Sequence, residues 1–380
     1  MPKFYRCWAE VDLDALRQNL LFIRQKVGRD VKIATVVKAD AYGHGLKQIA
    51  ALLMQSGTDV FGVANLTEAE AIRSVAKGWN ILMLGACLPD EIKYAVSDNI
   101  MPTISSEYEV DQFSQEAKRQ GKTVKIHIKI DTGMTRLGVN WNNALNLIEY
   151  ALRLPQIKIE GIYTHFSSAE DDADFTKLQK DRFSSVIKEV KKRNIKIPFI
   201  HCNNSAGIIH EPKTIFNMVR PGLLVYGIAP EGKRNMDQKI KKHLKPALSF
   251  KCRVSFVKEI PPKTPLSYGK TFVSKRKMKI ATITAGYGDG YMRAGSNKAQ
   301  VIIHGTRCSI VGKVTMDQML ADVTEVEDVK PGDEVVLIGS QENSAIDAPE
   351  VARWFGTIPY EVFTNITYRV PRIYKGVHAA

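Results

Sequence analysis

A lysine stands where an apolar run ends and a glycine-containing turn begins. The segment KIATVVKADAYGHG brings Lys38 to the end of a run rich in β-branched residues, followed by Tyr42, Gly43 and Gly45. A lysine that is partly desolvated beside other cations has a lowered pKa, and its neutral amine can form a Schiff base with an aldehyde. The alternative is a lysine whose stem covers apolar surface while its ammonium reaches water. This segment alone leaves both interpretations open.

Other polar side chains follow later apolar runs in the same way. At the carboxyl ends of parallel barrel strands such side chains meet at one rim, where active sites are built. A serine and free backbone amides at the rim can hold a phosphate, and an amine beside a phosphate cradle indicates pyridoxal 5′-phosphate (PLP). These side chains are Lys129, Asp131 and Arg136 in HIKIDTGMTRLG, His165 in YTHFSS, Asn204 and Ser205 in HCNNS, and Arg220 with Gly222 in VRPG.

The elements that must position these groups are eight short apolar runs separated by helical-looking stretches. A helix over 13–27, with Asp12 as its N-cap, precedes them. Strands that alternate with helices over this length predict an α/β fold with an N-terminal (β/α)8 TIM-like barrel over residues 12–240. The runs lie at 32–39, 61–65, 81–85, 101–105, 124–130, 158–164, 199–203 and 222–226.

A second domain follows a polar, basic segment at residues 231–246, which ends in proline. From Ala247 onward, alternating runs such as SFKCRVSFV and AQVIIH are separated by turn residues. We therefore predict a mostly-β domain over 241–380. The opening segment 1–11 is expected to join this domain as an additional strand.

The composition of the chain indicates where the protein works. Its five cysteines are scattered and form no CxxC pair, which indicates reduced thiols. The absence of an apolar leader or of a run long enough to span a bilayer predicts a cytoplasmic protein without a membrane partner. The net charge of +14 permits a nucleic-acid binder. Because aromatic residues are not interleaved with the basic ones, a solvated basic surface is favoured. The other histidines lack metal-ligand spacing, so no metal is expected and they are taken as structural or surface residues. They are His44, His127, His201, His210, His243, His304 and His378.

Taken together, the motifs resemble those of alanine racemases, members of the fold-type III family of PLP enzymes. The resemblance spans nearly the whole chain, and VVKADAYGHG is its most specific part. The matching segments, in the order of that family, are AEVDLDAL, VVKADAYGHG, KIDTGMTRLG, YTHFSSAED, HCNNSAG, VRPGLLVYG, LSYGKTF, AGYGDGY, VTMDQ and GTIPYE.

The resemblance implies a two-base racemisation of alanine that supplies D-alanine for peptidoglycan. Lys38 would carry PLP as a Schiff base and act as one base, and Tyr268 of the partner subunit would act from the opposite face, so that the active sites of a homodimer are shared. A tyrosine with a pKa near ~10 is a poor base at neutral pH and needs a helping neighbour. In this family that neighbour would be His165, which would contact both the tyrosine and Arg220.

Arg220 would face the pyridine nitrogen of PLP. A guanidinium donates hydrogen bonds and hardly ever loses its proton, so the ring nitrogen would stay unprotonated. The cofactor would then be a weaker electron sink than in transaminases, which favours racemisation over side reactions.

Further roles are implied by the same resemblance. The phosphate would contact Tyr42, Ser205, Tyr360 and the amides of Gly222 and Leu223, with Asn204 nearby. Arg136 would approach the phenolic oxygen of PLP and would also bind the substrate carboxylate, together with Met316 of the partner subunit and Asp317 of the partner subunit. Lys129 is either a carbamylated lysine or an ordinary partner of Asp131. Tyr287 and Arg293 would line the access channel, although tyrosines in β domains commonly serve packing.

Three alternatives remain at this stage. A PLP-dependent decarboxylase of the same fold type would place a glutamate at the pyridine nitrogen and use a late cysteine motif, which HGTRCSIVG around Cys308 does not resemble. A non-catalytic PLP-binding protein would lack the second domain. A racemase of broader or serine specificity would share all the features above.

Overall fold

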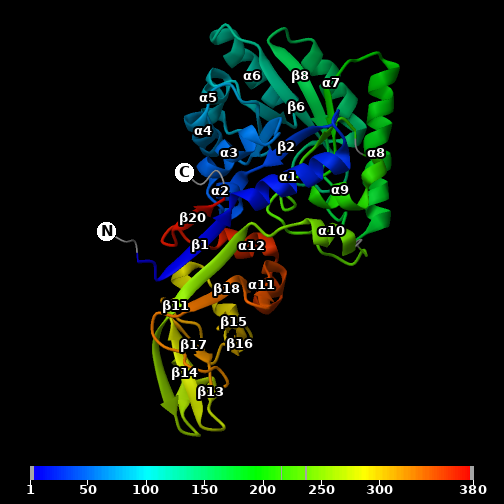
Figure 1. Cartoon of the computed structure of the whole chain (residues 1–380). Coiled ribbons are helices and arrows are strands. Elements are labelled where there is room, and N and C mark those ends of the chain that lie inside the picture. Colours follow the sequence, from blue (N-terminus) through cyan, green and yellow to red (C-terminus); the bar gives the residue numbers. More distant parts are fainter. Residues whose placement is uncertain (1–3, 215, 236–237, 377–380) are drawn as a thin grey trace. The chain divides into compact units, whose positions relative to one another are not determined.

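Eight short strands alternate with helices in the first part of the chain and pair side by side in parallel (Figure 1). The computed structural model describes residues 4–214, 216–235 and 238–376. The sheet order β10-β2-β3-β4-β5-β6-β8-β9 makes the first and last strands of the series neighbours, which confirms the predicted barrel, nearly closed. The strands are β2 (Lys32–Val36), β3 (Val60–Val63), β4 (Ile81–Met83), β5 (Met101–Ile104), β6 (Val124–Asp131), β8 (Ile157–Tyr163), β9 (Phe199–His201) and β10 (Met218–Val219), with β7 (Val139–Asn140) beside β6.

Helices cover the outside of these strands. Figure 1 shows α6, α7 and α8 outside β6 and β8. Their starts follow from capping side chains: Ser106 accepts a hydrogen bond from the amide of Glu109, and Asp172 accepts one from that of Phe175. The helices are α1 (Leu13–Val27), α3 (Leu46–Gln55), α4 (Leu66–Val75), α5 (Ile92–Ser97), α6 (Glu107–Arg119), α7 (Ala144–Leu152), α8 (Ala173–Lys192), α9 (Ser205–His210) and α10 (Gln238–His243).

The prediction of a strand at 222–226 is wrong. The eighth strand is β10, and residues 222–226 form successive turns. Pro221 has no amide hydrogen for a strand ladder, and the amide of Gly222 bonds instead to the side chain of Ser205. Leu224 and Val225 are nevertheless fully buried. The run is therefore apolar because it is buried, and burial alone does not specify a strand.

The second unit is built on a mostly antiparallel sheet, in agreement with the predicted mostly-β domain. Its path is β16-β15-β18-β11-β1-β20, and the long strand β11 also pairs with β14 (Figure 1). Two helices, α11 (Ala348–Phe355) and α12 (Pro359–Thr364), belong to it. Its strands are β1 (Cys7–Asp12), β11 (Leu248–Ile260), β12 (Pro265–Leu266), β13 (Phe272–Val273), β14 (Met278–Ile283), β15 (Gln300–Ile303), β16 (Thr306–Ser309), β17 (Met319–Asp322), β18 (Glu334–Gln341), β19 (Ser344–Ile346) and β20 (Arg372–Lys375).

The first strand of the chain lies in this second sheet. β1 pairs antiparallel with β11, with Ala9 opposite Phe250, and parallel with β20. By packing, the barrel unit comprises Arg17–Ala41 and Leu46–Lys245; the other unit comprises the chain up to Leu16, Tyr42–Gly45 and the chain from Pro246. Of the ranges predicted from the sequence, residues 1–3, 215, 236–237 and 377–380 lie outside the described residues.

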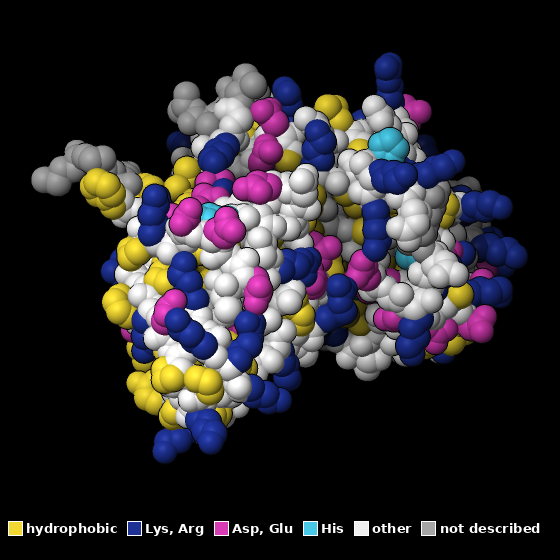
Figure 2. Space-filling model, turned by 60° about the horizontal axis from the view of Figure 1, so that its bottom comes forward, with side chains coloured by type: hydrophobic (Ala, Val, Ile, Leu, Met, Phe, Trp, Pro, Cys, Tyr) yellow, Lys and Arg dark blue, Asp and Glu magenta, His cyan; other side chains and the backbone are white. Residues whose placement is uncertain are grey.

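Charged side chains are mixed on the face shown in Figure 2. There, Lys and Arg side chains alternate with Asp and Glu side chains and do not gather into one stripe over the described residues of that face. Among the helices that the structure describes, none is both long and apolar enough to cross a bilayer.

The turn that follows β2 is unusual because it winds left-handed. In α2 (Lys38–Gly43), four successive non-glycine residues, 39–42, have φ between 51° and 54°. Left-handed helical backbone costs about 1–2 kcal/mol per non-glycine residue, so the turn requires fixed partners. Asp40 supplies one by accepting from the amide of Leu46 at 2.7 Å.

Glu68 on α4 supplies the second fixed partner. Its Oε1 accepts from the amide of Ala39 and its Oε2 from the amide of Ala64, both at 2.7 Å. One carboxylate therefore ties the turn after β2 to the segment after β3. Bonds from a backbone amide to an ionised carboxylate are among the stronger ones.

We expect Glu68→Ala to lower the free energy of unfolding by about 2–4 kcal/mol, because two such bonds are lost and the left-handed turn is released. Urea denaturation followed by fluorescence measures the change. The matched control is Glu70→Ala, an exposed glutamate of the same helix, which should shift stability by less than about 0.5 kcal/mol. Equal effects of the two variants would contradict the role given to Glu68.

Candidate active site

The barrel residues singled out in the sequence stand at or just beyond the carboxyl ends of the strands. Lys38 follows β2, Lys129 lies in β6, His165 follows β8, Ser205 follows β9 and Arg220 follows β10. The carboxyl-end rim is where parallel barrels carry their active sites. The central member of this set is Arg220.

Arg220 is buried, with 3% of its surface exposed, and is held by acceptors on three sides. Its Nη2 donates to the carbonyl oxygens of Thr164 at 2.7 Å and Cys202 at 3.1 Å, and its Nη1 lies 2.7 Å from Nδ1 of His201. The guanidinium also lies over the ring of Tyr163, 4.9 Å from its centroid. Within the described chain Nε has no acceptor, so its N–H can bond to a further group.

His165 is oriented by Arg220. Its Nδ1 lies 3.3 Å from Nη2 of Arg220, which can only donate, so Nδ1 must be the acceptor and the ring proton sits on Nε2. Burial and then the charge of Arg220 hold the pKa of His165 well below its usual value, so the ring is neutral. Asn204 Nδ2 is 3.5 Å from Nε2, but this amide nitrogen is itself a donor and bonds to the carbonyl of Phe166. The Nε2–H of His165 therefore remains available to another acceptor.

Lys129 is a buried cation among cations. Burial, reinforced by the charges of Arg220 and Arg136, lowers the pKa of Lys129 to about 7. Among the described residues no carboxylate lies within ion-pair distance of Lys129. Asp131 acts on it only from farther away, and its Oδ1 accepts from the amides of Gly133 and Thr135. The alternative of an ordinary Lys129–Asp131 ion pair is therefore not the arrangement found.

Lys38 is half-buried, and Arg136 in the same unit is exposed. Burial and the charge of Arg136 lower the pKa of Lys38, while the carboxylate of Glu68 opposes them. A larger share of neutral amine at a given pH is what Schiff-base chemistry requires.

Ser205 organises the loop after β10. Its Oγ accepts from the amides of Gly222 at 3.0 Å and Leu224 at 3.3 Å. The amide of Gly222, expected to contact a phosphate, thus already has a partner. The amide of Leu223 has no acceptor within the part of the chain that the structure describes, which makes it the better-placed donor for an anion.

Two tyrosines from distant segments meet in the other unit. The rings of Tyr42 and Tyr360 lie with centroids 5.7 Å apart. A side chain at Gly43 would meet the carbonyl of Phe363 at 2.3 Å, and Gly43 has φ +76°. Only glycine permits this approach, so the turn after Tyr42 is fastened beside α12.

Three loops carrying Tyr268, Met316–Asp317 and Tyr287 are joined by hydrogen bonds in the same unit. The Ser267 side chain donates to the carbonyl of Lys313, and the amides of Tyr287 and Gly288 donate to the carbonyls of Thr315 and Met316. The side chains of Tyr268, Met316 and Tyr287 are exposed to 72%, 53% and 42%. Large apolar groups exposed together indicate a surface that binds another molecule.

Arg369 fixes the Met316–Asp317 loop. It contacts Asp289 through Nε at 3.0 Å and Asp317 through Nη2 at 2.8 Å.

The outcome for the other residues of this unit is mixed. Arg293, expected to line the access channel, is exposed on the short helix Arg293–Gly295. The sequence prediction missed Arg369 and Glu68, because each acts through contacts that arise only in the fold and no local pattern marks them.

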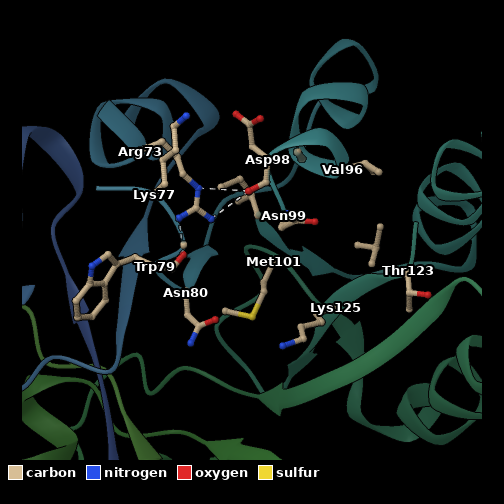
Figure 3. Close-up of a pocket in the computed structure, with 14 residues that line it drawn as sticks. Arg73, Lys77, Trp79, Asn80, Val96, Asp98, Asn99, Met101, Thr123 and Lys125 are labelled. Carbon is tan, nitrogen blue, oxygen red and sulfur yellow. Dashed lines mark hydrogen bonds between the residues drawn. The ribbon is translucent and has the colours of Figure 1, made fainter. Parts of the chain in front are cut away.

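A pocket of about 640 Å³ opens at the other end of the barrel, where residues 79–80, 99–100 and 123 precede β4, β5 and β6. Figure 3 shows its Arg73 donating to the carbonyl oxygens of Trp79 and Asp98, so this guanidinium fastens two loops. The pocket is lined by none of the residues predicted from the sequence to bind cofactor or substrate.

Among the described residues, no three His, Cys, Asp or Glu side chains gather closely enough to hold a metal ion.

Comparisons with known proteins agree with this geometry. Residues 11–230 match the family model "Alanine racemase, N-terminal domain", and residues 247–374 match "Alanine racemase, C-terminal domain". A curated alanine racemase of Halothermothrix orenii is 42% identical over 369 residues, which cover 97% of this chain and 96% of the relative.

Solved structures extend the similarity to the fold. An alanine racemase of Clostridium difficile 630 matches with a TM-score of 0.91 and 34% identity, covering 98% of this chain and 96% of that one. The alanine racemase of Bartonella henselae, solved with covalently bound pyridoxal phosphate, matches with a TM-score of 0.88 and 28% identity, covering 98% and 100%. The chain is therefore an isomerase that belongs to the alanine racemase family.

Proposed function

We propose that this protein interconverts L- and D-alanine with PLP, using Lys38 and Tyr268 of the partner subunit as two bases. The observation that carries the proposal is the buried guanidinium of Arg220, whose Nη1 and Nη2 both bond to groups of the protein and whose Nε lacks an acceptor within the described residues. This donor suits an unprotonated pyridine nitrogen. A decarboxylase of this fold type would require an acid at that position.

The barrel rim also suits the rest of the cofactor. Lys38 offers an amine of lowered pKa, and Ser205 and the Leu223 amide offer polar contacts for a phosphate, with Asn204 nearby. Tyr42, Tyr360 and Gly222 complete the proposed phosphate contacts. When bound, PLP supplies an aldehyde for the amino group and an electron sink that acidifies the α-hydrogen.

The chain's own residues move the proton. The neutral amine of Lys38 takes or returns the α-proton on one face, and the phenol oxygen of Tyr268 of the partner subunit does so on the other. His165 supports that phenol, because its Nε2–H is the donor left available by the bond between Nδ1 and Arg220. Arg136 binds the substrate carboxylate together with Met316 of the partner subunit and Asp317 of the partner subunit, and Tyr287 and Arg293 line the channel.

A homodimer with shared active sites follows from the same assignment. Tyr268 is exposed, and the exposed apolar side chains on the neighbouring loops suit a contact with a second subunit. We place the enzyme in the cytoplasm, where its D-alanine would supply peptidoglycan synthesis.

The decarboxylase alternative is disfavoured by Cys308 as well. This cysteine is 2% exposed on β16, and burial raises its pKa to about 12, so it offers no reactive thiolate. A racemase of serine or broader specificity shares every contact above. Repeating the following experiment with serine and other small amino acids separates these possibilities.

Incubation of the PLP-loaded protein with L-alanine in D2O tests the proposal. We expect loss of optical rotation together with α-deuteration, and Lys38→Ala should abolish both. Tyr268→Phe should slow racemisation by about 10²–10⁴-fold, the usual contribution of a positioned base, while α-exchange with retention persists for one enantiomer. Tyr108→Phe, at an exposed tyrosine of the barrel unit, should change neither rate.

Two results would contradict the assignment. A protein that binds PLP but leaves the α-hydrogens of alanine, serine and other small amino acids untouched is a binding protein. Release of CO2 from an amino acid would instead identify a decarboxylase.

Lys129 is proposed to be carbamylated. Attack of its neutral amine on CO2 forms an N–C bond and releases one proton, which converts a buried cation into an anion beside Arg220 and Arg136. The lowered pKa of about 7 provides the neutral amine, and the surrounding positive charge stabilises the product. The resulting carbamate would hold Arg136 in position.

We expect 13C-bicarbonate to give a 13C carbamate signal in the wild-type protein at about pH 8, where the amine is largely neutral. The signal should weaken as the pH falls through about 7, because protonation removes the nucleophile. Lys129→Met should lack it. A wild type without the signal, or a variant that retains it, would show that Lys129 is an unmodified lysine.

A further inference from the structure

Two fully buried histidines lie inside the barrel behind Arg220. His127 on β6 and His201 at the end of β9 are both 0% exposed, and Nδ1 of His127 lies 3.0 Å from Nε2 of His201. Nδ1 of His201 lies 2.7 Å from Nη1 of Arg220. The three side chains therefore form one continuous chain of contacts that ends at the guanidinium.

The positions of the protons along this chain follow from chemistry alone. Arginine can only donate, so Nδ1 of His201 must accept and its ring proton must sit on Nε2. That Nε2–H points at Nδ1 of His127, which must accept in turn, so His127 also carries its proton on Nε2. Within the described chain, Nε2 of His127 has no partner, and the chain of bonds ends there.

Packing fixes the ring planes in this arrangement. The rings of Tyr163 and His201 stack at 4.7 Å with 3° between their planes. The Tyr163 hydroxyl lies 2.6 Å from Thr103, which donates to the carbonyl of Met83, so the tyrosine donates and is itself held. The His127 ring occupies space left by Gly161, where a Cβ would lie 2.4 Å from two ring atoms.

The surroundings exclude a charged ring. The cations that act on the pair are Arg220 and, for His201, also Lys129, and no carboxylate opposes them among the groups acting on the pair. Burial and then Arg220 lower the pKa of His127 to about 3. The other tautomer of His201 would set an N–H against the N–H of Arg220 at 2.7 Å, where the two donors repel.

We propose that His127 is a positioning residue for Arg220: by accepting the Nε2–H of His201, it selects the only tautomer of His201 that can hold the guanidinium. The inference rests on the proposed function for the role of Arg220 at the pyridine nitrogen. The tautomers themselves do not depend on PLP. They can therefore be examined whether or not the protein is a racemase.

The first test is long-range 15N–1H NMR of the protein labelled with 15N-histidine, with and without added PLP. We expect His127 and His201 to be neutral Nε2–H tautomers that do not titrate between about pH 5 and about pH 9, unlike an ordinary histidine with a pKa near ~6.5. An Nδ1–H tautomer or an imidazolium at His201 would overturn the proposal, even in a protein without racemase activity.

The second test compares two substitutions at the same site. His127→Asn keeps an acceptor near the position of Nδ1 and should retain the His201 tautomer and kcat within about two-fold. His127→Leu removes the acceptor. It should mix the His201 tautomers, shift the absorbance of bound PLP and lower kcat for alanine by about ten-fold, with KM nearly unchanged because the substrate contacts are intact.

Other results are equally decisive. If His127→Leu leaves the His201 tautomer and the PLP absorbance unchanged, His127 serves packing only. Equal loss in the Asn and Leu variants would also exclude selection by the acceptor. If His127→Leu does not fold, Gly161→Ala tests the same point, because its methyl displaces the His127 ring and should disturb the His201 tautomer.

Discussion

The guanidinium of Arg220 is the group around which the barrel interior is arranged. It is buried, it can only donate, and it keeps its proton, so every neighbour within hydrogen-bond distance must present a lone pair. Two backbone carbonyls and the Nδ1 atoms of His165 and His201 do so. Breaking such a set by removing one acceptor leaves a buried donor unsatisfied, at a cost of about 1–3 kcal/mol. The cation alone determines the tautomer of His165, whereas His201 is held in one tautomer from two sides, by Arg220 at Nδ1 and by His127 at Nε2.

The same cation sets the electrostatics of the rim. Arg220 and Arg136 act with burial to lower the pKa of Lys129 to about 7, and Arg136 acts with burial on Lys38. The positive charge at this rim favours binding of an anionic phosphate. The lowered pKa values favour the neutral amine that a lysine needs for nucleophilic attack. Since these effects arise from burial and from neighbours on other strands, they are properties of the fold and not of any single motif.

The sequence predicted the barrel because its strands are short, β-branched and separated by amphipathic helices, and it placed Lys38, His165, Ser205 and Arg220 at strand ends. It failed at residues 222–226, where an apolar run is buried in turns, because burial and strand pairing give the same local pattern. It could not identify Glu68, whose partners Ala39 and Ala64 are ordinary residues contacted only through their amides. The left-handed turn at 39–42 was also hidden, because its residues are not glycines and only tertiary contacts hold them there.

The two proposed bases lie in surroundings of opposite kind. Lys38 belongs to the half-buried rim, where desolvation and a neighbouring cation favour its neutral form. Tyr268 stands on an exposed loop, and its hydroxyl has no hydrogen-bond partner among the described residues of its own chain. A phenol acts as a base only when a donor stabilises its anion. Under the proposed mechanism that donor is the Nε2–H of His165, which is available because Arg220 requires Nδ1 as an acceptor. The second base would therefore be effective only where His165 and Arg220 are already in place, so proton abstraction from both faces would be confined to the assembled site.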